Sequence, residues 1–148
     1  MVKHDSVLYS LGKNVRAARE KAALTQEKLA EIAELEYPWR IDRTELVDGS
    51  GGRGRFTGGM AMRRDLTLLA DEADGMYYVE QTVAEFAPRG RAGGESGAPG
   101  AALLRRAGET HWQSLPGKGY LRLKKGDSVS FISAAGGGYG PVGVVDTD

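Results

Sequence analysis

The chain has 148 residues, no cysteine, 22 glycines, and 20 basic against 20 acidic side chains. This length fits one domain, or one domain with a short appendage, and a hydrophobic share of 41% is enough to bury a core. The absence of cysteine excludes a disulfide scaffold, a thiolate metal site and a cysteine nucleophile, and it favours a cytoplasmic location. A net charge of zero argues against strong electrostatic binding to nucleic acid. Only short apolar stretches occur, so we expect no membrane association.

The glycine content divides the chain into two parts of different composition. Residues 1–36 contain one glycine, and residues 37–148 contain the other 21. In the first part apolar residues recur at spacings of four, three and four, at Leu11, Val15, Ala18 and Ala22. This spacing places them on one side of a helix, and a second apolar stripe follows Thr25, which can cap a second helix. Residues 1–36 therefore predict a short helical hairpin.

Beyond Pro38 the apolar period changes to two, which is typical of half-buried strands. The alternating residues are Met60, Met62, Leu66 and Leu68, then Tyr77, Val79 and Val83, then Leu121 and Leu123, then Val129 and Phe131. The Lys-Lys-Gly-Asp sequence at 124–127 predicts a hairpin turn. Between Pro88 and Gly119 small residues, glycine and proline predict a long loop with one apolar patch at 101–104.

These patterns predict an α+β fold with two parts. Residues 1–36 form a helical segment, and residues 37–148 form a glycine-rich, mainly antiparallel β module. Paired glycines in the second part suit tight strand corners or places where another backbone or a ligand comes close.

The segment from Leu11 to Ala33 resembles the first two helices of a Cro/repressor-type helix-turn-helix domain. An arginine-rich first helix is followed by a Thr-Gln pair at the start of the second. The resemblance implies DNA contacts from Arg16, Thr25, Gln26 and Lys28. A recognition helix should follow, but Pro38 falls there, and a proline inside a helix costs about 3 kcal/mol. The alternative is an amphipathic hairpin that only covers apolar surface on the rest of the chain.

From Tyr37 onward the motifs resemble those of the hydantoinase B/oxoprolinase family. A Tyr-Pro-led strand precedes a Ser-Gly-Gly turn at 50–52 and an Arg-aromatic-x-Gly-Gly turn at 55–59. Further motifs follow in family order: a glycine-rich loop at 87–101, Leu-Pro-x-Lys at 115–118, Gly-Asp at 126–127 and Gly-Gly-Gly-Tyr-Gly at 136–140. The resemblance covers about residues 37–148 and concerns only the C-terminal part of the family.

This second resemblance implies an activity that the chain shares with partners. Family members carry out ATP-dependent opening of cyclic amides such as hydantoins or 5-oxoproline, with an A-type subunit as partner or fused to them. ATP and a divalent metal belong to the full complex, and the residues that hold metal and substrate lie mainly upstream of the part present here. The resemblance therefore implies a chain that is inactive alone, with no cofactor of its own and no identifiable catalytic residue.

Three residues are candidates for ligand binding. Arg53 and Arg55 are flanked by glycines and can present guanidinium forks to a carboxylate or phosphate. Lys118, in the Leu-Pro-x-Lys element, is the third. The two histidines, His4 and His111, have no second ligand at metal spacing, so we predict no metal site built from this chain.

Three functional hypotheses remain open at this stage. The first is a truncated or accessory hydantoinase B/oxoprolinase-type module. The second is a small helix-turn-helix transcriptional regulator with a β-rich C-terminal part. The third is a chimeric chain without selected activity, which the change of resemblance between Glu36 and Tyr37 suggests.

Overall fold

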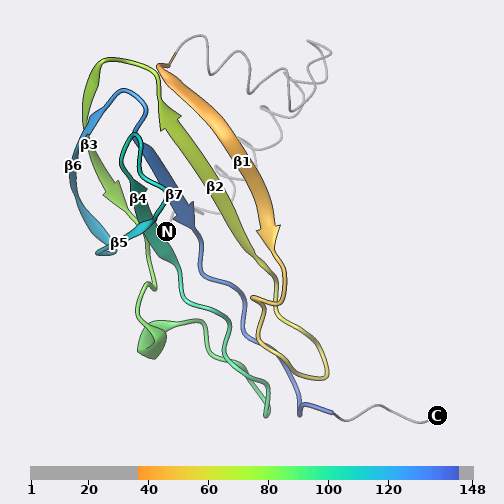
Figure 1. Cartoon of the computed structure of the whole chain (residues 1–148). Helices are drawn as coiled ribbons and strands as arrows, with labels where there is room; N and C mark the ends of the chain where they lie inside the picture. Colours follow the sequence, from red (N-terminus) through yellow and green to blue (C-terminus); the bar gives the residue numbers. More distant parts are fainter. Residues whose placement is uncertain (1–36, 144–148) are drawn as a thin grey trace, which may run out of the picture. The chain divides into compact units, whose positions relative to one another are not determined.

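A computed structural model describes residues 37–143 of the chain (Figure 1). These residues form the strands β1 (Trp39–Val47), β2 (Ala61–Leu68), β3 (Glu72–Tyr78), β4 (Ala101–Arg105), β5 (Gln113–Leu115), β6 (Lys118–Lys124) and β7 (Ser128–Ile132). A single 3-10 turn, η1 (Ala84–Phe86), lies between β3 and β4.

The predicted α+β class is therefore wrong, because the part that the structure describes is all-β. The helical part of that prediction rested on the apolar spacing of residues 1–36. The described residues instead alternate with a period of two, which is typical of strands. The helical hairpin predicted for 1–36 lies outside the described residues, and the boundary near residue 36 stays a prediction. Within 37–143 no helix has the length and apolar character needed to cross a bilayer.

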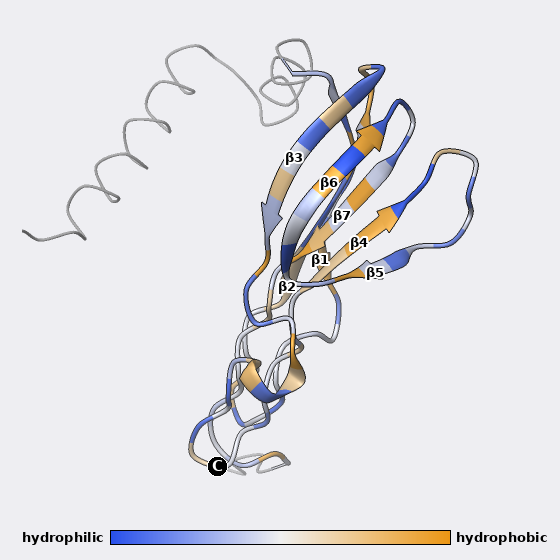
Figure 2. Ribbon diagram, turned by 90° about the vertical axis from the view of Figure 1, so that its left-hand side faces the viewer, coloured by the Kyte–Doolittle hydropathy of each residue, from blue (hydrophilic) through white to orange (hydrophobic). Residues whose placement is uncertain are grey.

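The strands form two antiparallel sheets (Figure 1). One has five strands in the order β1-β2-β7-β4-β5, and the other consists of β3 and β6. The core lies where one face of the larger sheet packs on the smaller one, around the buried side chains of Leu68, Leu104, Leu123 and Val129. Figure 2 shows hydrophobic and hydrophilic residues alternating along several strands, as expected where one face of a strand is buried.

Several strand predictions are confirmed. Met62, Leu66 and Leu68 lie in β2, and the runs at 121–123 and 129–131 lie in β6 and β7. Met60 precedes β2, and of Tyr77, Val79 and Val83 only Tyr77 lies in a strand, β3. The turn at 124–127 also forms, with Gly126 at φ 86°, a conformation that favours glycine. It is not a hairpin turn, however, because β6 pairs with β3 and β7 pairs with β2 and β4, so the turn carries the chain from one sheet to the other.

The long loop predicted between Pro88 and Gly119 is the clearest error at the level of elements. Residues 101–105 form β4, which lies between β7 and β5 in the larger sheet, and residues 113–115 form β5. The segment before β4 is also ordered, as part of a glycine-rich structure.

Three glycine-rich segments run side by side below the sheets, and we call them the glycine bundle: residues 50–59, 88–100 and 134–140 (Figure 1). Each segment is hydrogen-bonded to the other two through backbone groups. The Gly52 N–H donates to the Gly136 carbonyl at 2.9 Å, the Gly138 N–H to the Glu95 carbonyl at 2.8 Å, and the Ala98 N–H to the Ser50 carbonyl at 2.9 Å. The bundle thus satisfies backbone groups that no strand ladder satisfies.

Close backbone contact explains why this bundle needs glycine. At ten glycines a Cβ atom would lie within 3.0 Å of backbone elsewhere in the bundle. The close backbone belongs to a neighbouring segment at Gly52, Gly54, Gly58, Gly94, Gly97, Gly136, Gly137 and Gly138, and to a later residue of the same segment at Gly51 and Gly90. None of these ten has a φ in the left-handed region, so space and not φ is the constraint there. Of the two uses of glycine that the sequence suggested, close approach is the one that dominates in the bundle.

Candidate functional site

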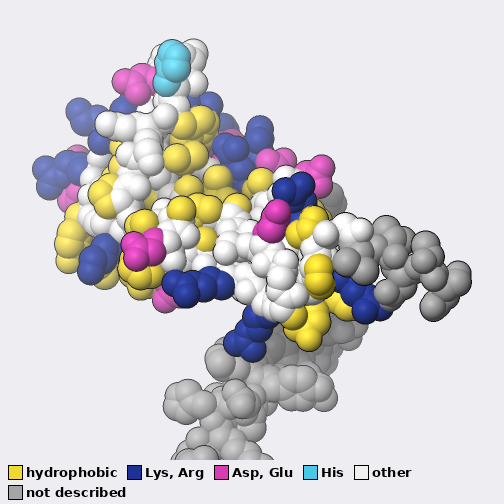
Figure 3. All heavy atoms as spheres, turned by 90° about the horizontal axis from the view of Figure 1, so that it is seen from below, with side chains coloured by type: hydrophobic (Ala, Val, Ile, Leu, Met, Phe, Trp, Pro, Cys, Tyr) yellow, Lys and Arg dark blue, Asp and Glu magenta, His cyan; other side chains and the backbone are white. Residues whose placement is uncertain are grey.

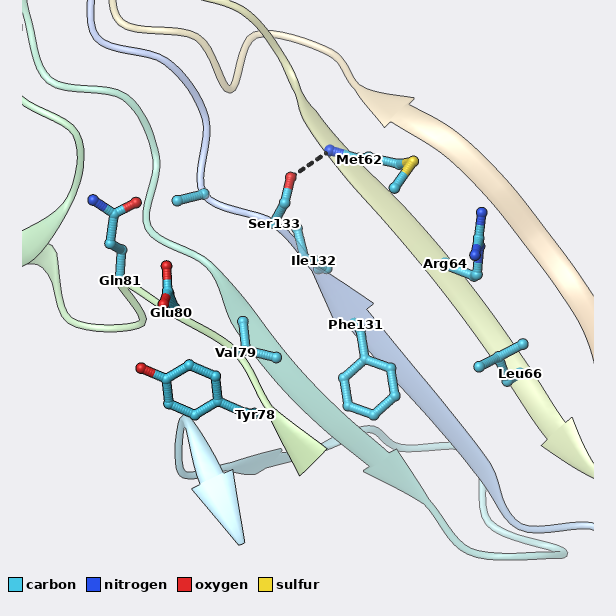
Figure 4. Close-up of a pocket in the computed structure, with 11 residues that line it drawn as sticks. Met62, Arg64, Leu66, Tyr78, Val79, Glu80, Gln81, Phe131, Ile132 and Ser133 are labelled. Carbon is cyan, nitrogen blue, oxygen red and sulfur yellow. Dashed lines mark hydrogen bonds between the residues drawn. The ribbon is translucent and has the colours of Figure 1, made fainter. Parts of the chain in front are cut away.

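A pocket of about 550 Å³ opens on the inner face of the larger sheet, beside the end of β3 (Figure 4). Leu66 of β2 and Phe131 of β7 contribute apolar surface to it. Arg64, Glu80 and Gln81 add polar groups to the lining. An apolar surface with a few polar groups is the usual make-up of a binding site for an organic molecule or a partner's side chains.

The titratable side chains in the lining of this pocket are Arg64, Tyr78 and Glu80. Its lining contains no histidine and no cysteine, and its one serine, Ser133, accepts a hydrogen bond from the Met62 N–H at 3.0 Å. No group of three His, Asp or Glu side chains that could hold a metal ion occurs among residues 37–143.

Sequence reasoning missed this pocket, although one residue carried a signal. Arg64 shares the parity of Met62 and Leu66, so a charged residue stands on the apolar side of a predicted strand. A charged residue on a core-facing stripe marks either a buried pair or the edge of a pocket. The contributions of Glu80 and Gln81 had no comparable signal, because they follow β3 in an irregular segment.

Of the predicted ligand-binding arginines, Arg53 is already engaged. Its Nε and Nη2 donate to the two carboxylate oxygens of Glu95 at 2.8 and 3.0 Å. This hydrogen bond, together with the charge of Glu95, raises the pKa of Arg53. The fork predicted for a ligand therefore joins two segments of the glycine bundle. The guanidinium carbon of Arg55 lies 5.5 Å from the centre of the Phe56 ring.

Lys118 lies in a different part of the molecule from this arginine pair. It begins β6 and pairs with Tyr78 across the two-stranded sheet. There it borders a second, mainly apolar hollow of about 580 Å³ together with Met76 and Tyr120. The structure does not combine Lys118 with Arg53 and Arg55 into one site, and ligand binding by each of the three stays a prediction.

The outer face of the larger sheet carries a buried polar row from β2 and β7. It consists of Asp65, Thr67, Ser128 and Ser130, whose exposed fractions are 5%, 6%, 2% and 0%. Arg63 holds Asp65 with two hydrogen bonds of 2.9 and 3.0 Å. Burial alone would raise the pKa of Asp65, but the hydrogen bond from Arg63 and the nearby positive charges outweigh it and lower the pKa. The hydroxyl groups of Thr67 in β2 and Ser128 in β7 are hydrogen-bonded at 2.7 Å, so the row joins two strands and has a structural role.

Trp112 lies over this polar face. The guanidinium groups of Arg63 and Arg105 approach its ring centre to 5.7 and 4.7 Å, and both contacts have cation–π geometry. His111, beside it, is exposed and lies 3.0 Å from the Thr110 hydroxyl through its Nδ1. The structure thus places the one described histidine in no arrangement with a carboxylate and a nucleophile.

The described residues thus form an all-β module whose larger sheet carries an open pocket and whose glycine bundle joins three segments of the chain. A protein-family comparison matches residues 15–142 to hydantoinase B/oxoprolinase. The match covers most of the chain, and the chain therefore belongs to the hydantoinase B/oxoprolinase family.

The family match also bears on the N-terminal segment. It begins at residue 15 and so takes in Arg16, Thr25, Gln26 and Lys28, the predicted DNA contacts, which lie outside the described residues. Neither this match nor the structure supports the helix-turn-helix interpretation. Because the match runs across residues 36 and 37, it also counts against a chimera joined at that point.

Relatives and a solved structure give the same family. The chain is 32% identical over 119 residues to a protein of Pseudomonas sp. (strain NS671) named as a B-type D-/L-hydantoinase subunit, covering 80% of this chain and 20% of that protein. It is 28% identical over 119 residues to the 5-oxoprolinase of Dictyostelium discoideum, covering 80% of this chain and 9% of that protein. The crystal structure of ATP-dependent caprolactamase from Pseudomonas jessenii aligns with a TM-score of 0.62 and 26% identity, over 76% of this chain and 20% of that one. The chain thus spans about a fifth or less of the proteins that it resembles.

Proposed function

We propose that this chain is an accessory, C-terminal-type module of a hydantoinase B/oxoprolinase enzyme and is inactive by itself. One observation carries the proposal: a family match over residues 15–142 in a chain that spans only 20% of its hydantoinase relative. The alignment with the caprolactamase structure, of which this chain covers 20%, supports the same relation of a part to a larger enzyme.

The reaction of the whole enzyme is the ATP-dependent opening of a cyclic amide. Hydantoin and 5-oxoproline are the substrate types that the names of two relatives indicate, and the caprolactamase is named as ATP-dependent. ATP and a divalent metal are bound by the rest of the assembly. This chain contributes a rigid glycine bundle and binding surfaces.

The partner is an A-type subunit. The hydantoinase relative is named as one subunit, of the B type, which supports an assembly of unlike subunits. Such an assembly in the cytoplasm is our expectation from the lack of cysteine and stays a prediction.

The test is to co-produce the tagged chain with an A-type hydantoinase subunit and to isolate the complex through affinity and size-exclusion chromatography. Hydrolysis of hydantoin and 5-oxoproline is then measured with and without ATP, for the chain alone and for the complex. We expect co-purification in a fixed ratio and no turnover by the chain alone. Failure of the folded chain to retain the A-type subunit, or turnover by the chain alone, would contradict the proposal.

A further inference from the structure

The glycine bundle carries few large side chains, and these are mainly of two kinds. Only seven of its side chains are larger than valine: Arg53, Arg55, Phe56, Arg89, Arg91, Glu95 and Tyr139. Four are arginines, two are aromatic and one is acidic, although basic and acidic residues are equal in number over the whole chain. The bundle is therefore a positively charged region of a neutral protein.

Two of the arginines and both aromatic residues lie close together across the three segments. Tyr139 forms one backbone bridge with Phe56 and another with Arg91, so its segment lies between theirs. The rings of Phe56 and Tyr139 are 6.4 Å apart, and Arg55 lies over the Phe56 ring. We call Arg55, Phe56, Arg91 and Tyr139 the basic–aromatic patch.

The patch is open to solvent. Phe56 and Tyr139 are 60% and 56% exposed, and the Arg91 side chain is also exposed. Figure 3, which views the molecule from below, shows basic and hydrophobic side chains next to one another on the surface. Exposure of two neighbouring aromatic rings on a small module is typical of a surface that binds a partner.

The backbone beneath the patch is held in place. Hydrogen bonds of 2.9 Å join the Phe56 N–H to the Tyr139 carbonyl, the Tyr139 N–H to the Phe56 carbonyl and the Arg91 N–H to the Gly138 carbonyl. A Cβ on the intervening Gly138 would lie 2.3 Å from the Arg53 carbonyl oxygen, which shows how closely the segments pack. A surface that is ordered before binding loses less conformational entropy when a partner docks.

We propose that the basic–aromatic patch docks an acidic surface of the A-type subunit, an inference that rests on the proposed function. Arginine, tyrosine and phenylalanine are enriched at the centres of protein interfaces, and lysine is depleted. The bundle contains no lysine. The charge selects a partner that presents carboxylates, which arginine forks bind in a bidentate manner, while the two rings supply apolar contact. A partner protein fits better than nucleic acid because the chain as a whole is neutral, with a pI of about 6.8.

The experiment uses calorimetry or biolayer interferometry to measure binding of the purified full chain to the purified A-type subunit. The test variants are Arg91→Glu and Tyr139→Ser, and the matched control is Lys124→Glu, which makes the same charge change at an exposed position of β6. At about 0.15 M salt we expect Arg91→Glu and Tyr139→Ser to weaken binding about tenfold or more. Binding by Lys124→Glu should stay within about twofold of the wild type, and raising the salt should weaken wild-type binding.

Folding is checked by thermal unfolding, and Arg91→Lys serves as a variant that keeps the charge and should bind more tightly than Arg91→Glu. If the wild type binds and the patch variants bind equally well, this inference is overturned while the proposed function stands. If the patch variants lose affinity only for single-stranded DNA or for phosphatidylserine vesicles, tested in parallel, the patch serves a different partner and the inference is again overturned. A wild-type chain that binds no A-type subunit overturns the proposed function and this partner with it.

Discussion

At the residue scale, the buried carboxylate of Asp127 joins two segments of the chain. It is 3% exposed and accepts hydrogen bonds from the Ala107 N–H at 2.8 Å, the Lys124 N–H at 3.0 Å and the Arg106 guanidinium at 2.6 Å. These bonds join the loop after β4 to the turn between β6 and β7. Asp127→Ala leaves the donors without an acceptor, so we expect a loss of about 2–3 kcal/mol in the free energy of unfolding, measured with urea. The control, Asp74→Ala, removes a solvent-exposed pair with Arg122 and should change stability little. Equal losses in the two variants would contradict this role for Asp127.

Acid should destabilise the module through three carboxylates. Burial raises the pKa of Asp42, Asp65 and Asp127, but hydrogen bonds and neighbouring arginines outweigh burial and leave each pKa below its usual value. A folded-state pKa below the unfolded value stabilises the fold above the unfolded pKa, and this stabilisation is lost as pH falls through the folded pKa. We therefore expect the free energy of unfolding to be steady near neutral pH and to fall below about pH 4. The wild type should be more stable than Asp127→Asn near neutral pH, and this difference in the free energy of unfolding should shrink as pH drops from about 5 to 3. A constant gap would show that the Asp127 charge does not contribute.

The sequence carried unequal information about individual residues. Arg53 and Arg55 stood out because glycines flank them, and the structure places both on the bundle surface. The partner of Arg53 could not be predicted, because Glu95 lies 42 residues away in the sequence and only the packing of the segments brings the two together. The same limit applies to Tyr139, whose place between Phe56 and Arg91 is a consequence of the bundle.

At the element scale, periodicity predicted strands where one face is apolar, and failed where composition dominated. β2, β6 and β7 alternate clearly, so their residues were identified. β4 was missed because its five residues follow a glycine- and proline-rich segment that suggests a loop. Its interior place in the sheet depends on pairing with β7 and β5, which no local pattern encodes.

Glycine spacing should matter position by position in the bundle. A Cβ at Gly58 would lie 2.0 Å from the Gly136 carbonyl oxygen, whereas a Cβ at the adjacent Gly59 would meet nothing within 4 Å. We expect Gly58→Ala to lower the free energy of unfolding by about 3 kcal/mol or more, because backbone on both segments must move. Gly59→Ala should leave stability unchanged within about 1 kcal/mol. The free energy of unfolding of the wild type and of both variants is measured by denaturant titration. Similar stabilities for the two alanine variants would show that the segments do not pack as closely as described.

At the scale of the whole molecule, overall composition concealed how charge and glycine are distributed. Acidic and basic residues are equal in number over the whole chain, yet the bundle holds four arginines and one glutamate. Segments from three distant parts of the chain meet there, so the positive region arises only on folding. The glycine content was visible from the start, but it fits loops and packed backbone equally well. The hydrogen bonds between the three segments show that the glycines form packed backbone and not open loops.

The two halves of the region first predicted as one long loop should differ in local stability. Glu95 lies in the bundle, where its N–H donates to the Arg53 carbonyl at 2.7 Å and its carboxylate is held by the Arg53 guanidinium. Glu109 lies in the exposed connection between β4 and β5. A glutamate-specific protease needs several residues of extended, released backbone, and such opening is easiest where few tertiary contacts hold the chain. We therefore expect cleavage after Glu109 to precede cleavage after Glu95, as followed by mass spectrometry at neutral pH.

Gly58→Ala should speed cleavage at Glu95 and leave the rate at Glu109 unchanged, because it loosens only the bundle. If the wild type is cut at Glu95 as fast as at Glu109, the bundle opens on its own and cannot serve as a rigid support for a docking surface.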